Sequence, residues 1–286
     1  MNNQYSALEI LKKSTEFLSK YNVKSPKCDA EWIICHFLKI EKLDIYLDRY
    51  LITEKETLDK IRDAILRRSK REPLQYILGK VDFCNITLKC DSRALVPRFE
   101  TELLVEIIVK EHQVNFDGRI IDFGTGTGAL IISLAKQFPL ATCIGIDKSK
   151  DSIELAEENV SLNNCNDNVE LIHHDWYQNI NSLKKADILV SNPPYLTLDE
   201  WSNAEPEVKD HDPKDALIAS DGGKTDLKQI TTIAPVFLKK GGMIALEFGS
   251  GQSDFLIENL KDRFYNITIK NDLTGKRRFL VGFLKD

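Results

Sequence analysis

Several features that would define a function class are missing from this sequence. No apolar run reaches the roughly 18 residues that a membrane-spanning helix needs. The opening stretch, MNNQYSALEILKKSTEF, has no apolar core followed by a small-residue cleavage site, so we expect no signal peptide and a cytoplasmic protein. The six cysteines include no close pair at the spacing of metal ligands, so we expect reduced thiols and no bound metal. A net charge of −5 over 286 residues also argues against a nucleic-acid-binding protein, which would more often carry a basic surface.

What the sequence does contain is the composition of a globular protein of one large or two ordinary domains, with 42% hydrophobic and 29% charged residues. The charge is uneven, because residues 1–72 hold 15 Lys and Arg against 12 Asp and Glu while the remainder holds 24 against 32. Apolar residues in 1–72 recur at helical spacing, at Leu8, Leu11, Phe17, Leu18, Trp32, Ile33, Cys35, His36, Phe37, Leu58, Ile61, Ile65 and Leu66. We therefore predict a small helical domain over 1–72. Its charge alone favours a stabilising bundle over a surface for a macromolecular partner.

After Pro73 the pattern changes from helical spacing to alternation. Residues 73–92 alternate loosely around Gly79, which predicts a β-hairpin that links two domains. In 93–286, a helix that Thr101 can cap is followed by short apolar runs alternating with amphipathic helices. This α/β order predicts a mostly parallel sheet with helices on both faces, closed by an antiparallel pair. Ligands of such sheets bind beyond the carboxyl ends of the strands, here at the switch point between the first and fourth strands.

A glycine-rich turn follows the first strand of this sheet, in the segment IDFGTGTGAL. Gly124, Gly126 and Gly128 allow the backbone to turn sharply and to approach a ligand closely. Their G-x-G-x-G spacing differs from the G-x-G-x-x-G of dinucleotide pyrophosphate sites. Asp147, at the end of the second strand, can accept two hydrogen bonds from a ribose diol, a device that NAD enzymes also use. Together these residues predict a nucleoside site without saying which nucleoside it takes.

The fourth strand ends abruptly in Asn192, Pro193, Pro194 and Tyr195. Two prolines can neither continue a helix nor donate to a sheet, so the turn is stiff and its polar groups keep fixed directions. The side-chain oxygen of Asn192 and the carbonyl of Pro193 can accept both N–H groups of a planar amide or amine, on which Tyr195 can stack. An amide nitrogen is a poor nucleophile, so an enzyme must align it and place oxygen acceptors against its N–H groups. We predict that Asn192 orients and polarises such a group and does not abstract a proton early.

The GTGTG loop followed by NPPY resembles S-adenosylmethionine-dependent methyltransferases that act on planar nitrogens. A wider set of stretches resembles the PrmC/HemK family, the bacterial glutamine methyltransferases of peptide chain release factors: REPLQYILG, LVPRFETELLVE, IDFGTGTGA, DW at 175–176, SNPPY, EPEVKDHDPKDAL, LEFGSGQ and DLTGKRRF. The resemblance runs from about residue 70 to the C-terminus, with Phe99 where the family usually has proline. It implies a Rossmann-like methyltransferase sheet over 93–286 that uses S-adenosyl-L-methionine.

The same resemblance implies a substrate and a role for each motif. The substrate is the glutamine of the Gly-Gly-Gln motif of class I release factors, and the helical domain 1–72 docks the factor. The cofactor contacts would come from Gly124, Thr125, Gly126, Thr127 and Gly128, with Asp147 at the ribose, Trp176 at the adenine and Asn192 near the methyl donor. The substrate glutamine would be held by Asn192, Pro193, Pro194 and Tyr195, with Asn192, Pro193 and Tyr195 as the catalytic set. No direct contact with nucleic acid or membrane is expected.

Three other functions stay open on the residues. An adenine-N6 methyltransferase uses the same tetrapeptide on a flipped base, but the acidic chain has no basic recognition domain. A ribosomal-protein glutamine methyltransferase is related, although PRFETE resembles the release-factor branch better. An NAD-dependent dehydrogenase, or a nucleoside-binding module without catalysis, is opposed by the glycine spacing and by NPPY.

A few polar residues near these motifs have no single predicted role. Glu247 and Gln252, at the end of the fifth strand, suit a structural role as well as a substrate contact. Asp122 either meets the cofactor's ammonium group or braces the glycine loop. His173 and His174 adjoin on a strand and point to opposite faces, so they cannot share a metal ion. The polar loop 199–226 is well placed to cover the substrate.

Overall fold

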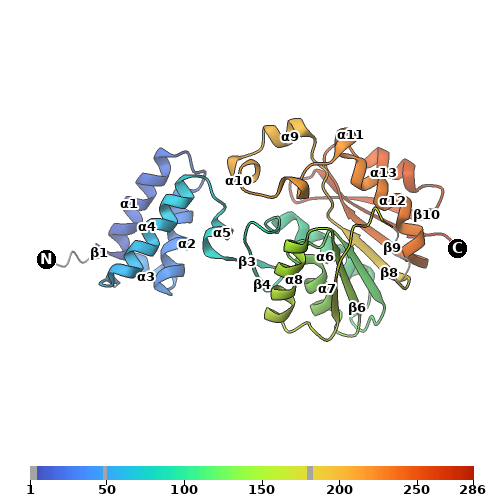
Figure 1. Ribbon diagram of the computed structural model, residues 1–286, viewed down its shortest axis with the longest axis horizontal. Coiled ribbons are helices and arrows are strands. Elements are labelled where there is room, and N and C mark those ends of the chain that lie inside the picture. The colour runs from blue at the N-terminus through green and yellow to red at the C-terminus, as the bar shows by residue number, and fades with distance from the viewer. Residues whose placement is uncertain (1–4, 48–49, 179–182) are drawn as a thin grey trace. The chain divides into compact units, whose positions relative to one another are not determined.

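The computed structural model describes residues 5–47, 50–178 and 183–286. It contains two compact units, of which the first comprises residues 1–79 with 205–211, and the second comprises 80–204 with 212–286. The chain therefore leaves the second unit after residue 204, returns to the first for seven residues, and enters the second again at 212. Figure 1 traces this path by colour from the N-terminus to the C-terminus.

The first unit is helical, as predicted, with a small two-stranded pairing beside the helices (Figure 1). Its elements are β1 (Tyr5–Ser6), α1 (Ala7–Lys20), α2 (Pro26–Leu38), α3 (Lys42–Tyr46), β2 (Leu51–Ile52), α4 (Lys55–Ser69), α5 (Leu74–Leu78) and α10 (Pro206–Lys209). The chain enters α1 through a capping box, in which Ser6 accepts from the backbone of Glu9 and the Glu9 side chain accepts from the backbone of Ser6.

Two members of the predicted apolar stripes face solvent. Trp32 is 56% exposed and Leu66 is 50% exposed, whereas Ile33, Ile34 and Ile65 are buried. Successive residues of a helix point about 100° apart, so a helix buries a stripe of limited width and residues beside that stripe face solvent. Because the core takes Ile33 and Ile34 from α2 and Ile65 from α4, Trp32 and Leu66 turn outward.

Segment 205–211 is held in the first unit by an ion-pair cluster. Glu207 accepts from Arg68 at 2.7 Å and from Arg71 at 2.6 and 2.7 Å. Arg68 is 6% exposed and also donates to Asp29 at 2.7 Å. Arg71 donates further to Glu205 at 2.9 Å. Partial burial raises the pKa of Glu207, but the hydrogen bonds from Arg71 and Arg68 outweigh burial and lower that pKa to about 2 from 4.5.

Replacing Glu207 by glutamine is expected to lower the free energy of unfolding at pH 7 by about 1–3 kcal/mol, between the values for an exposed and a buried ion pair. A folded-state pKa below the unfolded one stabilises the fold above pH 4.5, and this stability is lost as the pH falls toward 2. Urea unfolding at pH 7 and pH 4 should therefore show the difference between the wild type and Glu207→Gln shrinking in acid. Glu205→Gln is the control, because the Glu205 side chain is 48% exposed and should contribute little. A difference that persists undiminished in acid would rule out this ion pair as its source.

The second unit is built on a seven-stranded sheet in the order β10-β11-β9-β8-β5-β6-β7. Its strands are β5 (Arg119–Phe123), β6 (Thr142–Asp147), β7 (Val169–His173), β8 (Ala186–Ser191), β9 (Leu238–Glu247), β10 (Phe264–Asn271) and β11 (Arg277–Leu284). The neighbours β7, β6, β5, β8 and β9 run parallel, whereas β11 pairs antiparallel with β9 and β10 pairs antiparallel with β11. The predicted mostly parallel sheet with an antiparallel pair at one edge is confirmed.

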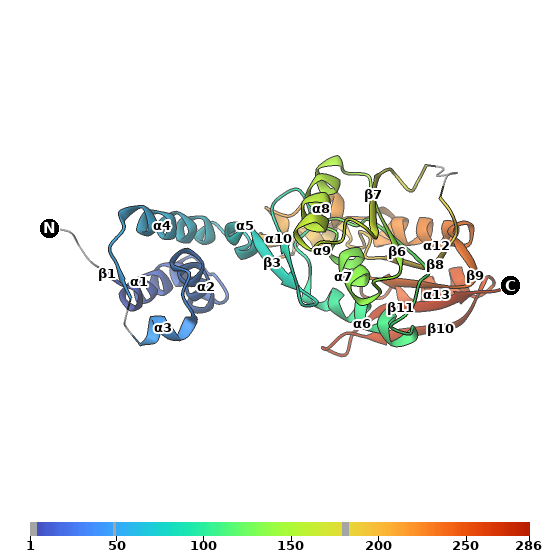
Figure 2. The ribbon, with the colours of Figure 1, turned by 90° about the horizontal axis from the view of Figure 1, so that it is seen from below.

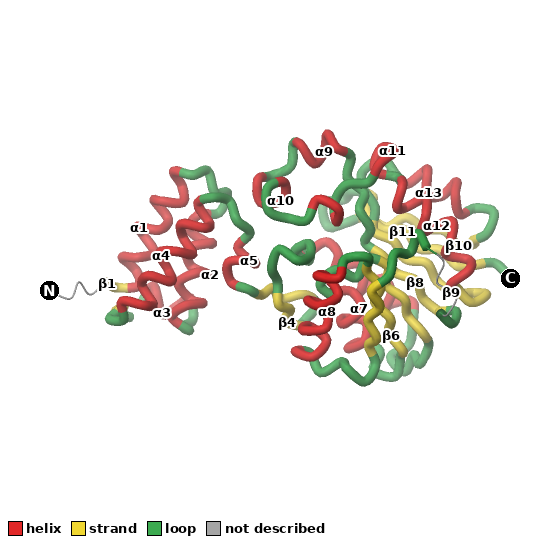
Figure 3. The backbone as a smooth tube through the Cα atoms, in the orientation of Figure 1, coloured by secondary structure: helices red, strands yellow, loops and turns green. Residues whose placement is uncertain are grey.

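Helices cover both faces of this sheet (Figures 1 and 3). One face packs on α6 (Glu102–Glu111), α7 (Ala129–Gln137) and α8 (Lys150–Leu162), and the other on α12 (Thr225–Phe237) and α13 (Ser253–Leu260). Along β5, Ile120 belongs to the first core and Ile121 to the second, and along β8 the same alternation holds for Ile188 and Leu189. Alternation of apolar side chains to both faces is the property of a fully buried parallel strand.

The linking hairpin is shorter than the sequence predicts. Residues 74–78 form helix α5 in the first unit, and the hairpin consists of β3 (Lys80–Phe83) and β4 (Ile86–Lys89) in the second. Gly79 ends α5 in the left-handed conformation, with φ of 69°, and so separates the two elements. The run Leu74–Leu78 is too short for its periodicity to distinguish a helical turn from a strand. Figure 2 shows α5 leading into β3. Of the helices that the structure describes, none has the length and apolarity of a bilayer span.

Candidate functional site

The sheet places the two predicted motifs next to each other. β5 lies between β6 and β8, so its carboxyl end is the switch point of the sheet. Phe123, the last residue of β5, pairs with Ser191, the last residue of β8, and Ser191 Oγ donates to the Phe123 carbonyl at 2.6 Å. The glycine loop therefore begins beside the first residue of NPPY, as predicted.

The glycine loop needs its glycines. Gly124, Gly126 and Gly128 have φ of 74°, 56° and 82°, a region that side chains with Cβ rarely adopt. The amides of Gly124 and Thr125 both donate to the Ile146 carbonyl, at 2.8 and 3.1 Å, which ties the loop to the end of β6. A Cβ on Gly124 would lie 3.2 Å from the Trp176 ring. The loop is thus packed against Trp176 as well as against β6.

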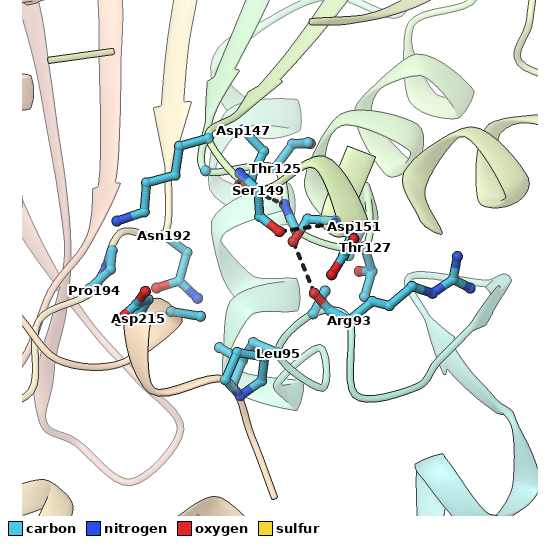
Figure 4. Close-up of a pocket in the computed structure, with 18 of the residues that line it drawn as sticks. Arg93, Leu95, Thr125, Thr127, Asp147, Ser149, Asp151, Asn192, Pro194 and Asp215 are labelled. Carbon is cyan, nitrogen blue, oxygen red and sulfur yellow. Dashed lines mark hydrogen bonds between the residues drawn. The ribbon is translucent and has the colours of Figure 1, made fainter. Parts of the chain in front are cut away.

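A cavity of about 930 Å³ opens at this switch point. Its wall includes Gly124, Thr125, Gly126, Thr127, Asp147, Trp176, Asn192 and Pro194. Figure 4 shows Asn192, Pro194 and Asp215 on one side of the hollow, and Arg93, Thr127 and Asp151 on the opposite side. Pockets for cofactors and drug-sized ligands span about 300–1,000 Å³, so this one can hold a nucleoside together with a second group.

Asp147 is held rigidly at the end of β6. Its two carboxylate oxygens accept from the backbone amides of Gly126 at 2.9 Å and Ser149 at 2.8 Å. Burial raises the pKa of Asp147, and these two amide donors oppose that rise. Each oxygen has a second lone pair, so the carboxylate can still accept from a diol in the cavity.

Asp122 braces the loop. It is fully buried, is not among the wall residues, and its Oδ2 accepts from Thr125 Oγ1 at 2.7 Å. Burial raises the pKa of Asp122 to about 7. Of the two roles predicted for this residue, the contacts favour bracing the loop.

Trp176 forms part of the cavity wall and part of the core. Its ring stacks on Phe123 with centroids 5.9 Å apart, and its side chain is 4% exposed. Its Nε1 has no hydrogen-bond partner among the residues that the structure describes, and the same holds for Nε2 of His174, another wall residue. Buried polar atoms without partners at a cavity wall match a ligand that carries its own hydrogen-bonding groups, such as a nucleoside.

The four residues of NPPY do not all face the cavity. Asn192 and Pro194 are wall residues, whereas Pro193 and Tyr195 lie outside the set that forms the wall. The Tyr195 hydroxyl donates to Glu247 Oε1 at 3.0 Å, and the Arg278 guanidinium lies 5.8 Å from the centre of the Tyr195 ring. The structure therefore brings Asn192 to the cofactor loop and anchors Tyr195 behind it.

Glu247 supports the tetrapeptide from the end of β9. It is 1% exposed, and its second oxygen accepts from Thr101 Oγ1 at 2.7 Å. Burial raises the pKa of Glu247, while its bonds to Thr101 and Tyr195 and the nearby Arg278 oppose that rise. Thr101 makes no capping hydrogen bond to α6, contrary to the prediction, because its hydroxyl is engaged by Glu247 and by Asn192.

Gln252 supports the other side of the same turn. Its Nε2 donates to the carbonyls of Tyr195 at 2.9 Å and Gly223 at 3.1 Å, and its Oε1 accepts from the Gly249 amide at 2.7 Å. Both Glu247 and Gln252 therefore hold the tetrapeptide in place, and of the two predicted roles the contacts favour the structural one.

Sequence reasoning missed several wall residues, including Arg93, Leu95, Thr101 and Asp215. No local pattern marks Arg93, whereas Asp215 lies in the resemblance stretch EPEVKDHDPKDAL and in the polar loop 199–226. The resemblance stretch LVPRFETE contains Leu95 and Thr101, and it could have marked these two residues as part of the site. His173 and His174 both reach the wall, yet in the described part of the chain no group of three or more His, Cys, Asp or Glu side chains could hold a metal ion.

Two family models match this chain. The PrmC N-terminal domain matches residues 9–79, and the methyltransferase small domain matches residues 99–204. The matched ranges correspond to the helical unit and to the part of the sheet that carries the glycine loop and NPPY.

Curated relatives cover nearly the whole chain. The release factor glutamine methyltransferase of Fusobacterium nucleatum subsp. nucleatum is 35% identical over 276 residues, which is 96% of this chain and 78% of the relative. That of Thermodesulfovibrio yellowstonii is 34% identical, over 96% of this chain and 98% of the relative. That of Francisella tularensis subsp. tularensis is 37% identical, over 91% and 92%.

Solved structures share the fold. The 16S rRNA methyltransferase of T. thermophilus, in complex with AdoMet and guanosine, has a TM-score of 0.51 at 16% identity, over 72% of this chain and 50% of that one. A methyltransferase from Pyrococcus furiosus has a TM-score of 0.50 at 17% identity, over 70% and 89%. The Rossmann-like sheet of the second unit is therefore the fold of S-adenosylmethionine-dependent methyltransferases.

Proposed function

Because this chain belongs to the release factor glutamine methyltransferase family, an S-adenosylmethionine-dependent group of enzymes, we propose that it methylates the side-chain amide of the glutamine in the Gly-Gly-Gln motif of class I release factors. The observation that carries the assignment is the position of Asn192, which shares one cavity wall with the glycine loop and Asp147. A planar amide presented to Asn192 would then face the cofactor. We also propose a cytoplasmic location, where release factors work.

The cavity residues fit S-adenosylmethionine. The backbone of Gly124 to Thr127 can contact the cofactor closely, whereas Gly128 lies outside the wall and packs against Ile132 and Ala156. Asp147 can accept from the ribose of the cofactor, and Trp176 can flank its adenine. When bound, the cofactor would supply an electrophilic methyl group, with the carbon–sulfur electron pair remaining on sulfur. The amide nitrogen would form the new bond to the methyl carbon and release one proton to water. Arg93, Asp151 and Asp215 are charged residues of the same wall.

The tetrapeptide would hold and polarise the glutamine amide. Asn192 Oδ1, on the cavity wall, would accept one N–H group of the substrate amide. The Pro193 carbonyl is the second acceptor that the sequence predicts, although Pro193 lies outside the set that forms the wall. Such acceptors stabilise the transition state most, because the N–H groups become more acidic while the new bond forms. Since the acceptors are preorganised, they need not reorient during the reaction. Alignment in a stiff turn supplies a further part of the rate, roughly 7–11 kcal/mol in well-oriented reactions. No strong base is required, since the proton becomes acidic as the methyl group arrives.

We further propose that residues 1–72 dock the release factor. Exposed aromatic and aliphatic side chains on this unit, including Trp32 and Leu66, suit a protein partner better than solvent.

A parallel methyl-transfer assay tests the function. The protein would be incubated with labelled S-adenosylmethionine and, separately, with a class I release factor, the same factor with its Gly-Gly-Gln glutamine replaced by alanine, ribosomal protein, and DNA. We expect label only on the unchanged factor. Label on the ribosomal protein or the DNA in place of the factor, or on the factor lacking that glutamine, would overturn the assignment.

A further inference from the structure

A line of hydrogen bonds connects the interior of the second unit to the cavity. Glu247, at the end of β9, is buried and is not a wall residue. Its Oε2 accepts from Thr101 Oγ1 at 2.7 Å, and Thr101 Oγ1 lies 3.2 Å from Asn192 Nδ2. Three residues from distant parts of the chain therefore form one connected line that ends at the wall.

The direction of each bond in this line follows from the donors available. A carboxylate only accepts, so the single hydroxyl proton of Thr101 is used on Glu247. The lone pairs of Thr101 Oγ1 can then only accept, and the end of the Asn192 amide that meets them must be the NH₂ end. The side-chain oxygen of Asn192 is consequently the end turned away from Thr101. An Asn amide has two orientations of equal shape, and this line distinguishes them.

We propose that Glu247 and Thr101 are positioning residues that select the orientation of the Asn192 amide in which its oxygen is offered to the substrate. This inference rests on the proposed function, in which that oxygen accepts an N–H of the glutamine amide. In the reversed orientation an NH₂ group would meet the substrate NH₂, and neither could accept. The buried carboxylate would thus act on the reaction through a hydroxyl without touching the substrate.

The same carboxylate anchors the far end of the tetrapeptide. Its Oε1 accepts from the Tyr195 hydroxyl at 3.0 Å. Arg278 lies over the Tyr195 ring and donates to the Phe248 carbonyl at 3.1 Å, so its positive charge is held close to Glu247. One buried carboxylate is therefore connected both to Asn192, through Thr101, and to Tyr195.

Replacing Thr101 by valine tests the line directly, because valine has nearly the shape of threonine and lacks the hydroxyl. We expect kcat/KM for the release factor to fall by about 10–100-fold, the range that misplacing a reacting group by roughly 1 Å produces. Cofactor affinity, measured by calorimetry, should stay within about threefold. Thr101→Ser retains the hydroxyl and should recover most of the activity.

A double substitution separates the line from a direct contact of Thr101 with the substrate. Glu247→Gln turns one acceptor oxygen into a donor, and alone it should also lower turnover. Combined with Thr101→Val it should add only the cost of its altered bond to Tyr195, since both changes break the same line to Asn192. Thr231→Val is the matched control, because Thr231 is buried in α12 and its hydroxyl donates to the carbonyls of Leu227 and Lys228 within the same helix. It should leave turnover unchanged, and thermal unfolding of all variants checks that they fold.

Several results would overturn the proposal. Wild-type turnover in Thr101→Val would remove the hydroxyl from the mechanism. Equal losses in the valine and serine variants would attribute the effect to packing, and additive losses in the double variant would show two independent roles. If Thr101→Val does not fold, Glu247→Gln alone must lower turnover at unchanged cofactor affinity. Failure of the wild type to label the release factor would instead reject the proposed function, so the two failures are distinguishable.

Discussion

Replacing Asn192 by alanine is expected to lower methylation of the release factor by about 10²–10³-fold, the loss that follows removal of one preorganised polar group at a reacting centre. The variant keeps the stiff proline turn, because Pro193 and Pro194 are buried and unchanged. It loses the oxygen that we propose accepts from the substrate amide. Cofactor affinity should fall by less than about tenfold, the cost of at most one hydrogen bond.

The measurement is a single-turnover methylation rate together with a cofactor dissociation constant from calorimetry. Asn203→Ala is the control, because Asn203 is exposed beyond the end of α9 (Leu198–Ser202) and donates to the Asp199 carbonyl. It should behave as the wild type. Unchanged turnover in Asn192→Ala would refute the role of the tetrapeptide, and a large loss of cofactor affinity with normal turnover at saturation would reassign Asn192 to cofactor binding.

Replacing Gly223 by alanine should lower turnover strongly, although Gly223 does not line the cavity. A Cβ at this position would lie 2.1 Å from the carbonyl oxygen of Tyr195 and 2.6 Å from Gln252 Nε2. Gly223 also has φ of 78°, which costs about 1–2 kcal/mol for a residue with Cβ. The displaced Tyr195 carbonyl would lose its bond from Gln252, at about 1–3 kcal/mol for a buried group left unpaired. We expect a loss of about 3 kcal/mol in the free energy of unfolding and of about 10²-fold in turnover.

The neighbouring glycine provides the matched control for this substitution. Gly222 has φ of 65° and no heavy atom within 4 Å of the Cβ that alanine would add. Gly222→Ala should therefore cost only the backbone strain, about 1–2 kcal/mol, and leave turnover intact. Urea unfolding and methylation rates of both variants make the comparison. If the two variants lose stability and turnover equally, the contact of Gly223 with the Tyr195 turn contributes to neither property.

Much of the fold could be predicted because its signals are local. From residue 119 onward, short apolar runs mark the strands and helical spacing of apolar residues marks the helices between them. This alternation predicts a parallel sheet. Parallel strands end at one edge, so the motifs after the first and fourth strands had to meet there. The short apolar run 74–78 is predicted as part of a hairpin but forms a helix, because five residues are too few for helical periodicity to be recognised.

The sequence by itself determined the sheet, the glycine loop, Asp147 and the stiff NPPY turn, since each depends on residues that are close together in the chain. Only the tertiary structure decided which side chains support that turn. Thr101, Asn192 and Glu247 are separated by 91 and 146 residues along their two hydrogen bonds, and Gly223 and Gln252 reach Tyr195 from two further segments. The sequence also does not predict that residues 205–211 belong to the helical unit. Contacts of this kind depend on how whole elements pack, and no local period of the sequence records that packing.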